Sequence, residues 1–183
     1  MLRDSDVVIT GLAHTAVRVA DVDRAVEWYR DVLGLRVLSP PYRMDGDGIA
    51  RDMGALVPEP VVVKSAIVGF DADGDRVLEV IEYPGSPPAH ESPADPSVLD
   101  LGFTHVGLLC DDIAASRTEL ERRGVRFLVS GIADVAGVRT TWFADPWGNI
   151  FILVQKVRSG SAGRRPPAPP RATVEAVAAT RPQ

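Results

Sequence analysis

The sequence is poor in cysteine, in long apolar runs and in net positive charge. A single cysteine, Cys110, excludes an internal disulfide. No apolar run approaches the ~18 residues that a membrane-spanning helix needs, so no membrane partner is expected. The formal net charge of -5 argues against nucleic acid as a partner, because nucleic-acid-binding domains usually carry a basic stripe. The N-terminal residues lack the apolar core of a signal peptide, and these absences together predict a cytoplasmic protein.

What remains is an ordinary globular composition that is interrupted at two places. Hydrophobic residues make up 45% and charged residues 25% of the 183 positions, as in typical soluble domains. The prolines of residues 83–97 exclude a long helix or a central strand, and the last 26 residues offer little to bury. We therefore expect four parts: a first module over 7–83, a proline-rich linker over 84–99, a second module over 100–157 and a disordered tail over 158–183.

The two modules are an internal repeat. The stretch GLAHTAVRVADVDRAVEWYRDVLGLRVL aligns with GFTHVGLLCDDIAASRTELERRGVRFL, with His14 and His105 at equivalent positions. Both stretches indicate a strand, an aspartate that caps a helix, and a glycine that ends the helix. Three β-branched runs follow each helix and indicate strands. The predicted fold class is α+β: two paired β-α-β-β-β modules that form a curved mixed-sheet cup with the helices outside.

Strand alternation places the polar side chains on the open faces of the predicted sheets. In the first strand, His14 and Arg18 share the face opposite the apolar residues that suit a helix. His105 occupies the equivalent face in the second module. The apolar neighbours of Glu79 suit helix packing, which leaves Glu79 on the open face, and the repeat gives Ile152 the matching position in the last strand.

Two imidazoles and one carboxylate on neighbouring strands are suitable ligands for a divalent metal ion: Zn, Fe, Mn, Co or Ni. The chain has only three histidines, and two of them are repeat-equivalent, which favours metal ligands over ordinary strand residues. The third, His90, falls in the linker and is expected to be solvated. The sequence therefore predicts a metal site of His14, Glu79 and His105.

Three stretches resemble the vicinal oxygen chelate superfamily: LAHTAVRVADVDRAVEWYRDVLGLRVL, FTHVGLLCDDI and FADPWGNIFILVQ. This group includes glyoxalases, methylmalonyl-CoA epimerases, extradiol dioxygenases, fosfomycin-resistance enzymes and bleomycin-binding proteins. The resemblance implies metal ligands on the first and fourth strands of both modules, which are here His14, Glu79, His105 and Ile152. The family usually has glutamate at the last position, so Ile152 is a vacant fourth-ligand position. The resemblance also implies a homodimer, with the cup either within one chain or between two.

The resemblance implies a metal-dependent isomerase, epimerase or lyase that stabilises an enediolate or enolate of a small substrate with neighbouring oxygens. Glu79 is the first candidate for the general base. Asp52 and Glu59, in a loop expected before the third strand, are further candidates, and Arg18 is a candidate for binding a substrate carboxylate or phosphate. The residues after Glu79 lack the polar pattern usual in glutathione-specific glyoxalases, which disfavours that activity.

Two alternatives remain open at this point. The count of two histidines and one carboxylate fits an Fe(II)-dependent extradiol-type dioxygenase, although that family normally takes its carboxylate from the position of Ile152. The vacant position favours a non-catalytic protein that binds a drug or metabolite. Metal content separates the binding protein from both enzymes, and oxygen uptake with catechols separates the two enzymes from each other.

Overall fold

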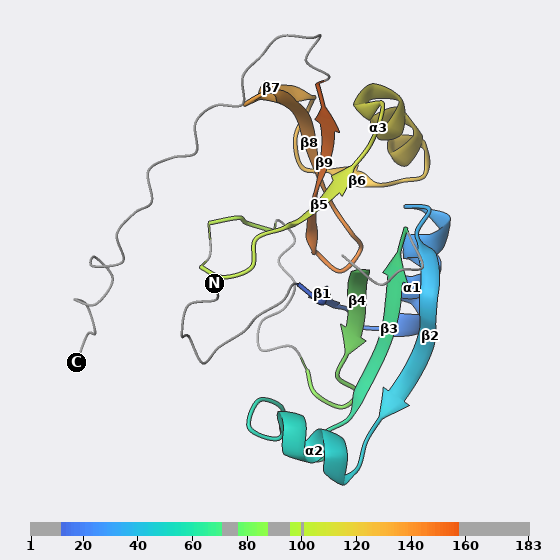
Figure 1. Cartoon of the computed structure of the whole chain (residues 1–183), viewed down its shortest axis with the longest axis vertical. Helices are drawn as coiled ribbons and strands as arrows, with labels where there is room; N and C mark the ends of the chain where they lie inside the picture. Colours follow the sequence, from blue (N-terminus) through green and yellow to red (C-terminus); the bar gives the residue numbers. More distant parts are fainter. Residues whose placement is uncertain (1–11, 71–76, 88–95, 100, 158–183) are drawn as a thin grey trace, which may run out of the picture.

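The computed structural model describes residues 12–70, 77–87, 96–99 and 101–157 (Figure 1). The first half forms a four-stranded sheet of strand order β1-β4-β3-β2. Strands β1 and β4 are parallel, and the other neighbours are antiparallel. Its elements are β1 (His14–Arg18), α1 (Val22–Asp31), β2 (Arg36–Met44), α2 (Asp47–Met53), β3 (Val63–Gly69) and β4 (Val77–Glu82).

The second half repeats this topology in a sheet of order β5-β9-β8-β6, with β7 paired to β8. Again the first and last strands, β5 and β9, are parallel neighbours. The elements are β5 (Val106–Leu109), α3 (Ile113–Arg122), β6 (Arg126–Phe127), β7 (Ala133–Val135), β8 (Val138–Ala144) and β9 (Ile150–Lys156). Two mixed sheets, each with a helix, confirm the predicted α+β class. The expected tail, His90 and half of the linker lie outside the described residues.

Both long helices begin and end where the sequence predicts. The carboxylates of Asp21 and Asp112 accept backbone N–H groups of the first turns of α1 and α3. Gly34 and Gly124 follow the helices with φ of 75° and 83°, a left-handed conformation that favours glycine. The equivalent caps explain why the repeat was readable from sequence.

Helix α2 corrects the expectation of a loop before the third strand. Ile49 and Met53 are four residues apart and so share one face of the helix. That face packs with the buried residues Val57, Val61 and Val63 at the end of the first sheet. Burial of this small apolar cluster stabilises a seven-residue helix that would be marginal by itself.

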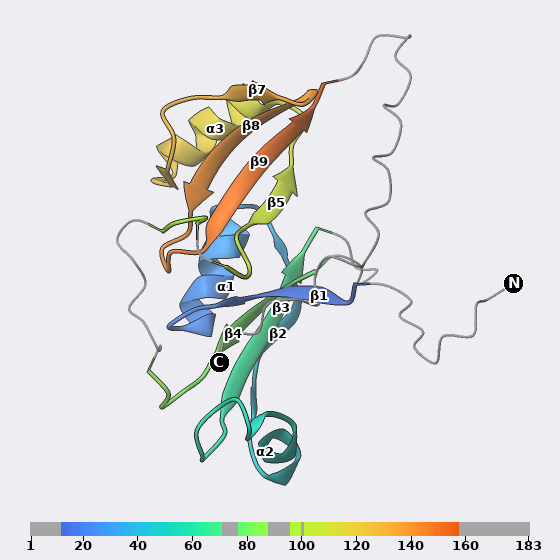
Figure 2. The same cartoon turned by 90° about the vertical axis from the view of Figure 1, so that its left-hand side faces the viewer.

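A single apolar core connects the two sheets. Tyr29 of α1 is fully buried, and its ring centroid lies 6.1 Å from that of Phe151 in β9. Helix α1 therefore packs against its own sheet and also reaches the start of the last strand of the second sheet (Figure 2). None of the helices in the described segments is long and apolar enough to cross a bilayer.

Candidate functional site

The open face of the first sheet carries the polar residues that the alternation predicted. Val17, Leu78 and Val80 are buried in the core on the side of α1. Because neighbouring strand residues point to opposite faces, His14 and Glu79 lie on the other side. The predicted assignment of faces is confirmed for β1 and β4.

His14 and Glu79 form a close pair on this face. His14 Nε2 lies 3.2 Å from Glu79 Oε2, and the two side chains are 49% and 17% exposed. The parallel register explains the approach, since Glu79 is paired with Ala16, two residues along β1 from His14. Two donors each about 2.1 Å from one ion, at 90–110°, lie roughly 3.0–3.4 Å apart. The pair therefore fits two adjacent ligands of a divalent metal.

Ser65 is a further neighbour of the Glu79 carboxylate that the sequence did not predict. Its side chain is fully buried, and its Oγ donates a hydrogen bond of 2.7 Å to Glu79 Oε1. This bond leaves Oε2 as the oxygen that faces His14. The sequence did hold a signal, because Ser65 is the one polar residue between Val63 and Ile67 on the face of β3 that Glu79 shares.

On the second sheet, the neighbours of His105 are a hydroxyl group and an aromatic ring rather than a carboxylate. It directly precedes β5, and its Nδ1 lies 2.8 Å from Thr104 Oγ1, which leaves Nε2 for a ligand. The imidazole meets the Trp142 ring edge-on, with centroids 4.7 Å apart. Trp142 is paired with Ile152 across β8 and β9, so an apolar pair stands on this sheet at the position of the family's fourth ligand.

The chain brings together His14 and Glu79 but does not add His105 to them. Among the residues that the structure describes, no three His, Cys, Asp or Glu side chains are placed to hold one metal ion. The predicted ligands therefore lie in two separate places within one chain, named here the two half-sites. The first half-site is His14 with Glu79, and the second is His105.

The two further base candidates lie away from the sheets. Asp52 is exposed on α2 rather than in the expected loop, and Glu59 is exposed in the segment that follows the helix. Neither belongs to a group of metal-ligating side chains with His14 and Glu79. Their role as bases stays a prediction.

Arg18 lies at the opposite end of β1 from His14, beside a cavity of about 720 Å³ between the two halves of the chain. Its guanidinium donates a hydrogen bond of 2.7 Å to the Ser86 carbonyl and lies 5.1 Å from the Tyr83 ring centroid. Trp147 and Asn149 line the other side of this cavity. Substrate binding by Arg18 stays a prediction, at a distance from the His14–Glu79 pair.

The comparisons with known proteins agree with this fold. The family model of the Glyoxalase/Bleomycin resistance protein/Dioxygenase superfamily matches residues 11–153. A lactoylglutathione lyase of Pseudomonas aeruginosa is 29% identical over 165 residues, which cover 82% of this chain and 85% of the relative. A 2-epi-5-epi-valiolone epimerase of Actinomyces sp is 27% identical over 146 residues, or 77% of this chain and 76% of the relative.

A solved structure shares the architecture at low sequence identity. A glyoxalase family protein from Bacillus cereus superimposes with a TM-score of 0.69 at 16% identity, and the match covers 86% of this chain and 99% of that one. Together with the family model, this likeness confirms the resemblance seen in the sequence motifs. The chain belongs to the glyoxalase/bleomycin resistance protein/dioxygenase superfamily, that is, to the vicinal oxygen chelate proteins.

Proposed function

We propose that the protein is a metal-dependent enzyme of the isomerase, epimerase or lyase type, which acts on a small substrate with neighbouring oxygens. The observation that carries the proposal is the His14–Glu79 pair, whose donor atoms lie 3.2 Å apart on an open sheet face. Members of this superfamily generally hold a divalent metal, and an imidazole with a carboxylate is a suitable donor set. The identity of the metal is left to experiment.

We further propose that two copies of the chain complete each site. One chain offers His14 and Glu79 as one half-site, and His105 stands apart from them. Phe103 and Leu109, two residues before and four residues after His105, are 67% and 62% exposed, which leaves large apolar residues of this segment in water. A homodimer that sets the first sheet of one copy against the second sheet of the other covers this surface and joins the half-sites.

The proposed roles of the residues follow from their positions. A divalent metal held by His14, Glu79 and the partner's His105 would supply a fixed positive charge to substrate oxygens. Ile152 provides neither a ligand nor a base, so Glu79 is the carboxylate available at the pair. To act as the base, its Oε2 would have to leave the metal and then take a proton from the substrate, while the Ser65 hydroxyl holds Oε1 in place.

Two relatives support chemistry of this type. One is named as a lactoylglutathione lyase and the other as a 2-epi-5-epi-valiolone epimerase. The first name bears on the lyase part of the proposal and the second on the epimerase part. The substrates in these names belong to the relatives, and this chain's own substrate has to be found by assay.

A second candidate is a binding protein without catalysis. The observation that favours it is the apolar setting of His105, where Trp142 and Ile152 stand in place of a fourth ligand. Such a protein would hold an organic molecule against this wall and would have no need of a metal. The His14–Glu79 pair favours the enzyme, because a binding protein gains nothing from these two donors.

Metal analysis of protein purified without chelators decides between the candidates. The enzyme proposal predicts about one divalent ion per chain, since coordinating side chains and metal are coupled. His14→Ala and His105→Ala should each remove that ion and leave a folded protein by circular dichroism. A metal-free wild type that gains nothing from added Zn²⁺, Fe²⁺, Mn²⁺ or Ni²⁺ would overturn the enzyme proposal in favour of the binding protein. If both variants keep their metal, the ligand assignment is wrong.

A further inference from the structure

The two halves of the chain are joined by a buried hydrogen bond between a tyrosine and a carboxylate. Tyr29 of α1 is 0% exposed, and Asp145, between β8 and β9, is 5% exposed. The Tyr29 hydroxyl donates to Asp145 Oδ2 over 2.6 Å. Burial and the neighbouring carboxylate raise the pKa of Tyr29 well above its usual range, so the hydroxyl keeps its proton and acts as the donor.

The same carboxylate organises the turn that leads into β9. Asp145 Oδ1 accepts the backbone N–H groups of Trp147 and Asn149, at 2.9 and 2.8 Å. The Asn149 side-chain amide donates to Asp145 Oδ2 at 2.8 Å and to the Arg18 carbonyl at 3.2 Å. One connected network therefore ties the 145–149 turn to both α1 and β1.

A second contact between the two modules joins the ends of helices α1 and α3. The Arg123 guanidinium, just after α3, donates to the carbonyls of Asp31 and Val32 at 3.0 and 2.9 Å. These carbonyls end α1 and would otherwise lack partners in the helix. The two helices are thus joined end to end while Tyr29 is held by the turn.

The tyrosine contact has no counterpart under the internal repeat. At the register of the helix starts, Tyr29 corresponds to Leu120, which is buried but has no hydroxyl. The contact therefore joins α1 specifically to the second module's turn. It selects one relative orientation of two modules that otherwise share the same topology.

This network connects the two half-sites through stiff elements. Arg18 ends β1, the strand that begins with His14. Asn149 directly precedes β9, which pairs with β5, the strand that follows His105. The Tyr29–Asp145 contact therefore lies on the path that joins the two half-sites, although it includes no proposed ligand.

We infer that Tyr29 and Asp145 are positioning residues, whose hydrogen bond fixes the angle between the His14–Glu79 half-site and the His105 half-site of the chain. If each metal site takes ligands from two copies, this angle decides whether the ligands can meet in both sites of the dimer at the same time. The effect on metal affinity rests on the proposed function, whereas the effect on the angle does not.

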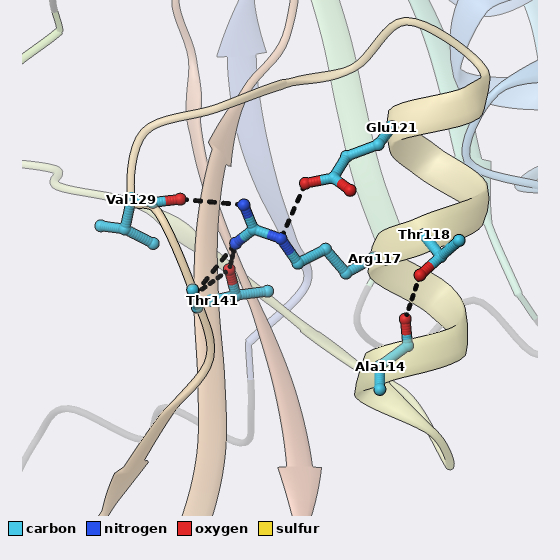
Figure 3. Close-up of polar contacts among 7 residues, drawn as sticks. Ala114, Arg117, Thr118, Glu121, Val129 and Thr141 are labelled. Carbon is cyan, nitrogen blue, oxygen red and sulfur yellow. Dashed lines mark hydrogen bonds and ion pairs between the residues drawn. The ribbon is translucent and has the colours of Figure 1, made fainter.

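The test removes one hydroxyl with Tyr29→Phe and uses Thr141→Val as a matched control. Thr141 Oγ1 is also buried, donates to the Gly131 carbonyl at 2.9 Å and accepts from Arg117, all within the second module (Figure 3). Arg117 keeps its contacts with Glu121 and Val129 in the control. Both variants lose one buried hydroxyl, but only Tyr29→Phe removes a contact between modules.

The first readout is the distance between the modules. Spin labels at Arg36→Cys and Ala115→Cys, both exposed positions, are placed in a Cys110→Ala background and diluted with unlabelled protein. Electron-electron resonance should give a single distance in wild type and in Thr141→Val, and a shifted or broadened distance in Tyr29→Phe. An unchanged distance in Tyr29→Phe overturns the inference, whatever the metal results are.

The second readout is Zn²⁺ affinity, measured by competition with a chromogenic chelator. Tyr29→Phe should weaken binding about 10-fold, as other changes that displace ligands without removing them do, while Thr141→Val stays within twofold of wild type. Equal losses in the two variants would mean general destabilisation and would contradict a positioning role. A wild type that binds no Zn²⁺ or other divalent metal would contradict the proposed function instead. In that case the distance measurement alone tests the inference.

Discussion

Substitution of Ser65 by alanine tests whether Glu79 is held in place for a ligand. Ser65 is fully buried, and its hydroxyl donates to Glu79 Oε1 over 2.7 Å. Alanine removes that donor and one oxygen from a packed position, with little change in the backbone. The Glu79 carboxylate then gains rotational freedom, while its distance to His14 is no longer fixed at 3.2 Å.

Two effects are expected, a loss of folding stability and a loss of metal affinity. A hydrogen bond to a charged group contributes about 1.5–3 kcal/mol to folding stability. Because the Glu79 side chain is 17% exposed, water replaces part of the lost bond, and we expect a loss at the lower end of this range, ~1.5 kcal/mol. Outer partners of metal ligands typically contribute 10- to 100-fold in metal affinity, and we expect about 10-fold here.

The assay combines urea unfolding with chelator competition for Zn²⁺ on wild type, Ser65→Ala and Ser65→Thr. Threonine keeps the hydroxyl, so its metal affinity should lie closer to wild type even if the added methyl group costs stability. A Ser65→Ala protein that binds metal as tightly as wild type would refute the reasoning, because Glu79 would then need no support from Ser65 or would not be a ligand.

Two further predictions concern the last strand and the helix junction. Ile152→Glu supplies the fourth ligand usual in the family and should tighten Zn²⁺ binding several-fold in chelator competition; unchanged affinity would mean that this position of β9 does not face the metal. Hydrogen bonds from Arg122 and Arg123 lower the pKa of Glu119 to about 2. Its stabilising contribution is therefore present above pH ~4.5 and lost as the pH falls toward ~2. Urea unfolding should show a stability gap between wild type and Glu119→Gln at pH 7 that narrows by pH 2; a gap that is the same at both pH values would contradict this assignment.

Much of the fold was predictable because its signals are local. The caps at Asp21 and Asp112 and the glycines after each helix are set by the nearest turn of backbone, so they appear in the sequence as short patterns. The faces of β1 and β4 follow from alternation, and the buried positions of Leu78 and Val80 confirm them.

The features that the sequence did not predict depend on contacts between distant segments. Helix α2 is stabilised by its contact with Val61 and Val63 rather than by its own sequence, so periodicity over seven residues was too weak a signal. Ser65 stands out in the sequence only as a lone polar residue on one face of β3, and its contact with Glu79 depends on the pairing of β3 with β4. Both are contacts between segments that no local pattern records.

The placement of the two half-sites was also beyond the sequence. The repeat shows that His14 and His105 are equivalent, but equivalence does not say whether the two sheets of one chain face each other. That choice depends on contacts between modules, such as the bond between Tyr29 and Asp145, which the repeat does not reproduce because Leu120 stands at the position equivalent to Tyr29. The resemblance left both arrangements open for the same reason.

The central claim is that each metal site takes His14 and Glu79 from one chain and His105 from another. Mixing His14→Ala with His105→Ala, after mild dissociation and reassociation, tests it most directly. Random pairing makes about half of the dimers mixed, and each mixed dimer has one intact site and one site that lacks both histidines. The account predicts that each variant alone holds no metal, whereas the mixture recovers about one ion per four chains. A mixture that stays metal-free although mixed dimers have formed, beside a wild type that binds metal, would contradict the shared site.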